Sequence, residues 1–172
     1  MYLSPKKIAL ICFSLGLILV ASSLVLRINS QKTKKAQETP IPSISPQPRR
    51  PHIAINQTTL LLEIADTPEK KSRGLGNHKP LADNEGMLFI YAPPQKVSFW
   101  MKDMTFSIDI IYINQGKIVE IYANVPAPSP NTLPYQLKSY PAHQPVDYVL
   151  ETSAGWSEKN HIQVGDSVKI SL

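Results

Sequence analysis

The alternation of apolar and polar residues after position 51 predicts a domain built mainly from short β-strands. Eight runs are rich in aliphatic and β-branched side chains and are separated by turn-forming residues. The predicted strands cover residues 52–56, 59–64, 87–91, 97–101, 108–113, 117–123, 146–151 and 167–172. Strands of this length and spacing are typical of all-β folds. We therefore expect residues 52–172 to form a compact antiparallel sandwich or barrel of about eight short strands, with one or two short helices.

Two turns are predicted between neighbouring strands. Asn114-Gln115-Gly116 fits a three-residue hairpin loop, with Gly116 at the position that requires a positive φ angle. The strands on either side of it should therefore pair antiparallel. A second turn is expected at Gln57-Thr58, between the first two strands.

Helix signals are few. Thr67 is a good N-cap, Pro68 suits the first helical position, and Gly74 can adopt the left-handed conformation that ends a helix. A second short helix is expected over residues 153–159, with Asn160 as its cap. These signals predict two short helices beside the strands.

Residues 125–145 interrupt the strand pattern with six prolines. Proline cannot donate a backbone hydrogen bond to a sheet, so this segment is predicted to be one long irregular loop. Loops of this length in compact domains are often functional or mobile.

The N-terminal residues follow a different pattern. Residues 8–26 carry no charge, and a helix of that length would reach about 28 Å, enough to span a bilayer. A cleaved signal peptide is the rival interpretation, because Ala21-Ser22-Ser23 supplies small residues after a shorter apolar core. Residues 1–27 are therefore expected to be a transmembrane anchor or a signal segment. Residues 28–51 are proline-rich and polar, which predicts a flexible, disordered linker.

Charge divides the chain at the same place. Residues 1–50 hold 8 Lys/Arg and 1 Asp/Glu, whereas residues 51–172 hold 10 and 12, a balance of −2. Because the domain is slightly acidic and has no basic stripe, we exclude nucleic acid as a partner. The basic residues that follow the apolar segment oppose export on the positive-inside count, although we expect the domain to be extracytoplasmic.

Cysteine, histidine and glycine limit the chemistry. The sole cysteine, Cys12, lies in the apolar segment, so the domain has no disulfide and no cysteine nucleophile. The four histidines lie far apart without metal-ligand spacing, and neither a metal nor a cofactor is expected. No GxSxG, P-loop or GxGxxG motif is present. Whether the domain is an enzyme stays open.

Charges within an apolar run mark the candidate site. Residues 97–113 are nearly all apolar, yet they include Lys102, Asp103 and Asp109. A buried carboxylate needs hydrogen-bond donors, water or a shifted pKa. If the two strands in this run are neighbours, Trp100 and Lys102 can approach the carboxylate of Asp109.

Two interpretations of these residues remain open. In the functional one, a pocket around Asp109 binds a small polar ligand or performs acid/base chemistry. Glu85 and Glu151 add a carboxylate pair that could hydrolyse a glycosidic bond at a suitable separation. In the structural one, the same groups form a salt-bridge and hydrogen-bond network around core tryptophans. The candidate ligand-binding residues are Asp109, Lys102, Trp100, Arg73, Glu85, Glu151 and Trp156.

Several motifs carry a resemblance to a known family. They are Ala65-Asp66-Thr67-Pro68-Glu69 with Arg73-Gly74-Leu75, Glu85-Gly86-Met87-Leu88-Phe89, Val97-Ser98-Phe99-Trp100-Met101-Lys102 with Asp109-Ile110, Tyr148-Val149-Leu150-Glu151 with Ala154-Gly155-Trp156, and Val164-Gly165-Asp166. In these motifs and their order the domain resembles the uncharacterised prokaryotic family named domain of unknown function 192. The resemblance implies a mainly β fold, frequent N-terminal export signals and no established activity. The chain departs from the family pattern at Gly76, where Met is usual, at Asp103 and over residues 105–107.

These observations lead to three functional hypotheses. We expect a membrane-tethered, extracytoplasmic binding or accessory module for an envelope ligand, in contact with the membrane through residues 8–26. A small envelope hydrolase acting on saccharide or peptide is the first alternative, and a purely structural domain is the second. A hydrolase needs Asp109, Glu85 or Glu151 to line an open cleft. A binding module exposes Trp100 or Trp156 beside polar groups, and a structural domain buries all of them.

Overall fold

Nine strands and two short α-helices make up the part of the chain that the computed structural model describes, residues 50–172. The strands are β1 (His52–Ile55), β2 (Thr58–Ala65), β3 (Glu85–Gln95), β4 (Ser98–Trp100), β5 (Ile108–Asn114), β6 (Lys117–Val125), β7 (Ser139–Pro141), β8 (Val146–Ser153) and β9 (Val168–Ser171). The helices are α2 (Pro68–Arg73) and α3 (Trp156–Lys159), and η1 (Pro134–Gln136) is a 3-10 turn. The mainly β prediction is confirmed.

The predictions for the N-terminal residues lie outside this description. The anchor or signal segment over residues 1–27 is not among the described residues, and the linker predicted over 28–51 is described only at its last two. Within the described part, no helix is both long enough and apolar enough to cross a membrane.

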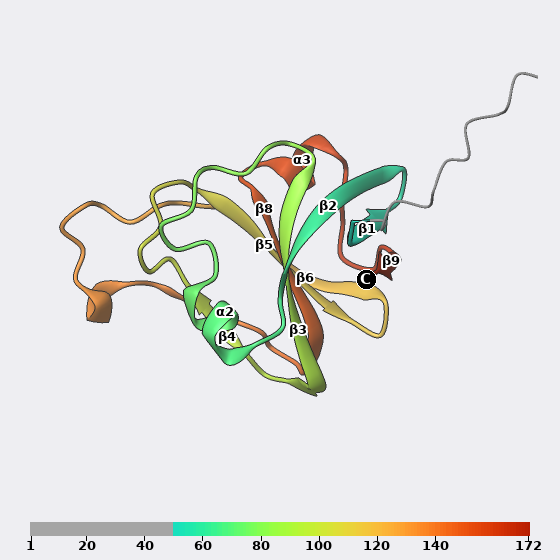
Figure 1. Cartoon of the computed structure of the whole chain (residues 1–172), viewed down its shortest axis with the longest axis horizontal. Coiled ribbons are helices and arrows are strands. Elements are labelled where there is room, and N and C mark those ends of the chain that lie inside the picture. The colour runs from blue at the N-terminus through green and yellow to red at the C-terminus, as the bar shows by residue number, and fades with distance from the viewer. Residues whose placement is uncertain (1–49) are drawn as a thin grey trace, which may run out of the picture. The chain divides into compact units, whose positions relative to one another are not determined.

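Seven strands form one curled sheet, a half-barrel, in the order β6-β5-β8-β3-β2-β1-β9 (Figure 1). The curl brings the first residues of β6 next to the start of β9, where Lys117 forms a bridge with Ser167 and the Val168 N–H donates to the Gly116 carbonyl at 2.8 Å. The predicted all-antiparallel arrangement is wrong at one place, because β2 and β3 run parallel. The segment that joins them, with α2 and the following loop, is long enough to make that crossover.

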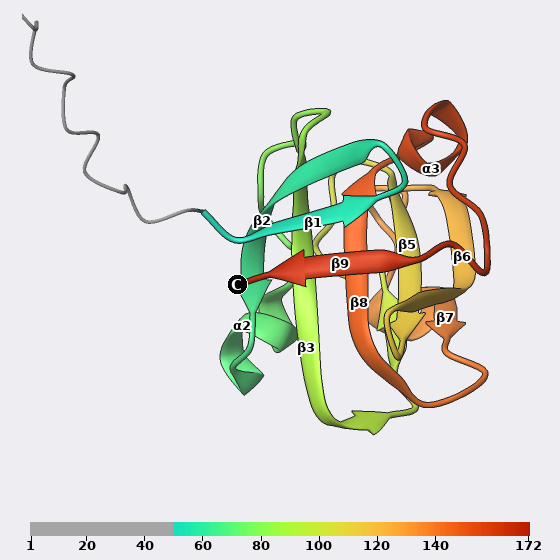
Figure 2. The same ribbon diagram turned by 90° about the vertical axis from the view of Figure 1, so that its right-hand side faces the viewer.

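The two faces of the sheet bury separate cores. Side chains alternate along each strand, so Leu88, Ile111 and Leu150 point to the inside of the curl, where β1 and β9 cross over β3 and β8 (Figure 2). Phe89 and Tyr112 belong to the cluster on the other face, which α2, β4 and β7 cover. This second layer carries the surface on which several candidate residues meet.

The covering layer contains a strand that the sequence pattern did not indicate. Within the predicted loop 125–145, β7 pairs antiparallel with β4, and the two form their own sheet. With three residues, one of them Pro141, β7 is too short to show alternation, and an edge strand tolerates proline. The predicted strand 97–101 therefore lies against β7 and is not a neighbour of β5.

The turn predictions are confirmed in kind and shifted in position. The β5–β6 hairpin is antiparallel, but its loop has only two residues, Gln115 and Gly116, with φ angles of 49° and 70°. Positive φ at both positions is the requirement of a type I′ turn. The first turn lies at Asn56-Gln57, one residue earlier than predicted, because Asn56 adopts a φ of 53°.

Both predicted helices are present. The Thr67 side chain accepts the Lys70 N–H at 3.3 Å, which caps α2, and Gly74 ends that helix with a φ of 52°. The second helix, α3, begins only at Trp156 and ends at Asn160 as predicted.

Candidate functional site

Asp109 is buried, and both oxygens of its carboxylate accept hydrogen bonds. Its side chain is fully buried on β5. Oδ1 accepts the backbone N–H groups of Asn124 at 2.8 Å and Gly155 at 2.9 Å. Oδ2 accepts the Ser157 N–H at 2.8 Å and the Ser157 hydroxyl at 2.5 Å. Asp109 therefore joins β5 to β6 and to the first turn of α3, a structural role.

The predicted contact of Asp109 with Trp100 and Lys102 is wrong. The neighbours of β5 are β6 and β8, whereas Trp100 ends β4 in the separate two-stranded sheet. Lys102 lies instead beside Trp100, with its Nζ 5.8 Å from the centroid of the indole ring. These two residues form one site on the surface, and Asp109 belongs to the interior.

Glu151 is a buried acid of a different kind. On β8 it lies between Met87 of β3 and Ile110 of β5, with only 5% of its surface exposed. Its Oε2 has no hydrogen-bond partner among the described residues. Burial raises the pKa of this carboxyl to about 8, so it is mainly protonated at neutral pH.

The two remaining candidates are separated from this interior carboxyl group. Glu85 is exposed at the start of β3, where its Oε2 accepts the Ala82 N–H at 3.2 Å. Trp156 is 3% exposed and packs in the core inside the curl. Because Glu151 is buried and Glu85 is on the surface, the structure provides no cleft flanked by the predicted carboxylate pair.

Arg73, Trp100 and Lys102 do come together. They line a surface depression of about 70 Å³ between α2 and β4, which we call the α2–β4 hollow. Its other walls come from residues 71–77 and from Phe99, Asp103 and Met104. Trp100 is 51% exposed, an unusual position for so large an apolar side chain.

The α2–β4 hollow carries excess positive charge. Lys71, Arg73 and Lys102 line it, with Asp103 as the one acidic residue among its lining residues. The ion pairs found within residues 50–172 involve none of these three cations. Lys71 Nζ lies over the Tyr91 ring, 4.5 Å from its centroid, so Arg73 and Lys102 are the two cations available to bind an anionic group.

Gly76 shapes the floor of this hollow and was not among the predicted site residues. A Cβ atom at this position would lie 2.9 Å from the Arg73 carbonyl oxygen and 3.3 Å from that of Lys102. The absence of a side chain thus allows the two walls to approach each other. The signal in the sequence was the departure from the Met that is usual in the resembling family.

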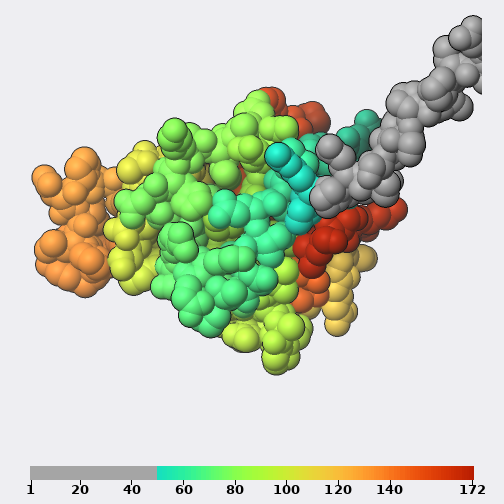
Figure 3. All heavy atoms as spheres, viewed as in Figure 1, coloured from blue at the N-terminus to red at the C-terminus, as the bar shows by residue number. Residues whose placement is uncertain are grey.

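A second depression continues from the first beneath residues 126–138, a loop that projects from the domain and that we call the arm (Figure 3). Its volume is about 260 Å³, and we call it the arm hollow. Both hollows share Asn77, Lys102, Asp103 and Met104, so they are adjacent, and we call the two together the groove. The proline content predicted a loop here, but nothing in it indicated a binding surface.

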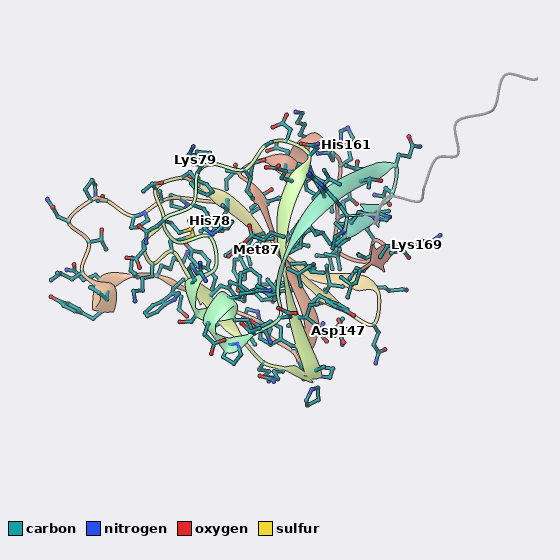
Figure 4. The ribbon with its side chains drawn as sticks, viewed as in Figure 1. His78, Lys79, Met87, Asp147, His161 and Lys169 are labelled. Carbon is teal, nitrogen blue, oxygen red and sulfur yellow. The ribbon has the colours of Figure 1, made fainter. Side chains whose placement is uncertain are left out.

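Another depression, of about 200 Å³, lies on the other side of Arg73 and is lined in part by His78 and Met87, which Figure 4 labels. His78 Nδ1 is 3.9 Å from a Glu63 carboxylate oxygen. No set of three or more His, Cys, Asp or Glu residues within the described range is placed to hold a metal ion.

Comparisons with known proteins give a family and a fold. Residues 52–170 match the model of DUF192, described as Uncharacterized ACR. A solved protein of unknown function from Novosphingobium aromaticivorans DSM 12444 is 28% identical, with a TM-score of 0.60 over 69% of this chain and 83% of the other. A protein from Sinorhizobium meliloti 1021, described provisionally as a transcription regulator, is 25% identical, with a TM-score of 0.62 over 73% and 98%. No curated protein matches the chain.

Proposed function

The chain belongs to the DUF192 family, and we propose that it is a membrane-tethered, extracytoplasmic module that binds an anionic envelope ligand in the α2–β4 hollow. One observation carries the proposal: a half-exposed Trp100 lies beside two cations, Arg73 and Lys102, that have no acidic partner within residues 50–172. An exposed aromatic ring provides apolar contact area, and a guanidinium group binds a carboxylate or phosphate through two hydrogen bonds.

A hydrolase has less support from the same geometry. Asp109 has its oxygens occupied by four hydrogen bonds, and Glu151 is buried beneath the covering layer. A general acid or base must reach the substrate within hydrogen-bond distance. Glu85 is exposed and lines a depression of about 330 Å³, but neither of the other two candidate carboxylates lines it. The exposed candidates that lie together are an indole and two cations, which suit binding.

Nucleic-acid binding has little support from the charge of the domain. Residues 51–172 have a formal charge of −2, and DNA binding depends on neutralising phosphates with Lys and Arg. The cations of the α2–β4 hollow form a local group, which suits a single anionic group better than a nucleic-acid backbone.

The binding proposal predicts a fluorescence response at Trp100. Adding D-galacturonate, a carboxylate-bearing sugar, to the full chain in mild detergent should change tryptophan emission, whereas uncharged D-galactose should not. Arg73→Ala should weaken galacturonate binding about tenfold or more, because a hydrogen bond to a charged group contributes about 1.5–3 kcal/mol. Titration of the emission measures both effects.

Two variants make the assignment specific. Trp100→Phe should abolish the response, because the remaining Trp156 is buried in the other core. Lys169→Ala removes a cation from β9, away from the hollow (Figure 4), and should bind as the unaltered chain does. Equal loss of affinity in Arg73→Ala and Lys169→Ala would mean that the hollow is not the binding site.

The tether is proposed from residues 8–26 and the linker that follows them, which would place the domain in the periplasm or at the cell surface. Alkaline phosphatase folds only in an oxidising compartment such as the periplasm. If residues 1–50 export the protein, a phosphatase fused after residue 50 should therefore be active in cells. Deleting residues 8–26 from the same fusion should abolish its activity. An inactive full-length fusion that is nevertheless produced would refute export.

A further inference from the structure

The groove is larger than the α2–β4 hollow alone, so it can hold more than a single anionic group. Resting on the proposed function, we infer that the ligand is an acidic oligosaccharide: its carboxylate binds in the α2–β4 hollow and the next sugar lies in the arm hollow. The arm hollow is thus a second binding position, on residues outside the predicted site set.

The α2–β4 hollow is too small to hold a whole ligand by itself. At about 70 Å³ the α2–β4 hollow is far below the roughly 300 Å³ at which small-molecule sites begin. The arm hollow, at about 260 Å³, supplies the missing space. Since the two share four lining residues, they are adjacent, and a ligand longer than one sugar can reach from one to the other.

The residues that line the groove change from charged to uncharged along its length. The part of the arm that lines its hollow contributes no charged residue, only Pro128, Ser129, Pro130, Thr132, Pro134 and Leu137. The cations are concentrated in the α2–β4 hollow, and Lys102 and Asp103 lie where the two hollows join. This arrangement fits a chain with an acidic end and an uncharged, hydroxyl-bearing continuation, to which Ser129 and Thr132 can offer hydrogen bonds.

The indole favours a sugar over a peptide. The cross-strand neighbour of Trp100 is Ser139, a small exposed residue that hydrogen-bonds Ser98 through the two hydroxyls at 2.6 Å. Small neighbours leave the flat indole surface accessible, and the C–H groups on one face of a sugar ring pack well against such a surface. Lys102 lies over the same ring system and can pair with the carboxylate of a sugar that packs there.

The test compares probes of increasing length on the full chain by isothermal titration calorimetry. Galacturonosyl-rhamnose, a disaccharide with one carboxylate and an uncharged second sugar, should bind at least tenfold more tightly than monomeric galacturonate, because only the disaccharide reaches the arm hollow. Ser129→Trp places a large side chain in that hollow and should reduce the affinity for the disaccharide to that for the monomer. Ser129 is exposed on the arm, so the variant is expected to fold, which circular dichroism checks.

The outcomes separate this inference from the function on which it rests. Equal affinity for the monomer and the disaccharide, with Arg73→Ala still weakening both, would overturn the second binding position and leave the proposed function intact. Binding of tetraglutamate in preference to galacturonosyl-rhamnose would overturn the saccharide assignment and replace it with an acidic peptide. Failure of all three probes to bind would overturn both proposals.

Discussion

Replacing Asp109 with Ala is expected to lower the free energy of unfolding by about 4 kcal/mol, with no direct effect on the α2–β4 hollow. The substitution removes the acceptor of three backbone N–H groups, those of Asn124, Gly155 and Ser157, together with that of the Ser157 hydroxyl. Leaving a buried donor unsatisfied costs about 1–3 kcal/mol, and water entering the vacated space offsets part of the sum. Urea denaturation followed by circular dichroism measures the change.

Two further substitutions show whether hydrogen bonding causes this loss. Asp109→Asn retains the side-chain shape and one acceptor oxygen, so about half of the destabilisation is expected. Asp83→Ala breaks an exposed ion pair with Lys159 and should cost less than about 1 kcal/mol. If Asp109→Ala instead denatured at the same urea concentration as the unaltered chain but lost ligand binding, Asp109 would belong to the site and our structural assignment would be wrong.

Replacing Glu151 with Gln is expected to stabilise the domain by about 4 kcal/mol at pH 8 and to have little effect near pH 4. The folded state raises the pKa of Glu151 from 4.5 to about 8 by burial, so it binds the proton more tightly than the unfolded state does. Protonated Glu151 therefore stabilises the folded state fully below pH 4.5, and this stabilisation is lost as the pH rises towards 8. Glutamine stays neutral and makes no such contribution to the pH dependence.

The measurement is the difference in unfolding free energy between the unaltered chain and Glu151→Gln across pH 4–9. Taking the difference removes the contribution of every other titrating group. Glu85→Gln changes an exposed carboxylate on the neighbouring strand β3 and should leave the pH profile nearly unchanged. A Glu151→Gln variant that was less stable than the unaltered chain at pH 8 would indicate that the Glu151 carboxylate is ionised and paired in the folded state, which would contradict the raised pKa.

The sequence predicted that Asp109 needs hydrogen-bond donors, but it did not predict which residues supply them. An isolated charge in an apolar strand indicated that Asp109 needed donors, and that requirement is met. The identity of the donors could not follow from strand alternation, because they lie 15 to 48 residues away and are brought together by the β6 pairing and by α3. Glu151 lies in β8, which is less apolar than β5, yet it is also buried, and its Oε2 has no partner among residues 50–172. The local sequence therefore did not indicate which of the two buried carboxyl groups would have donors.

Local structure was predictable where adjacent residues determine it. The hairpin at Gly116 and the cap at Thr67 depend on steric preference and on a donor three residues away, and both are confirmed. The β4–β7 pairing brings together Ser98 and Ser139, which are 41 positions apart in the chain, and a three-residue strand shows no alternation that could indicate it. The meeting of Arg73 with Trp100 is non-local in the same way. The candidate set included both residues but grouped them around Asp109, whereas they line a hollow on the surface.

The pairing of β1 with β9 determines where other molecules can be attached to the domain. His52, at the entry of the chain, lies opposite Ser171, at its exit, so the two ends of the domain are neighbours. The arm lies at the other end of the domain in Figure 1. A fluorophore, an affinity tag or a solid support joined at either end should therefore leave the groove accessible. Adjacent ends also suit circular permutation, in which a short peptide joins residue 172 to residue 52 and a new terminus opens in an exposed turn.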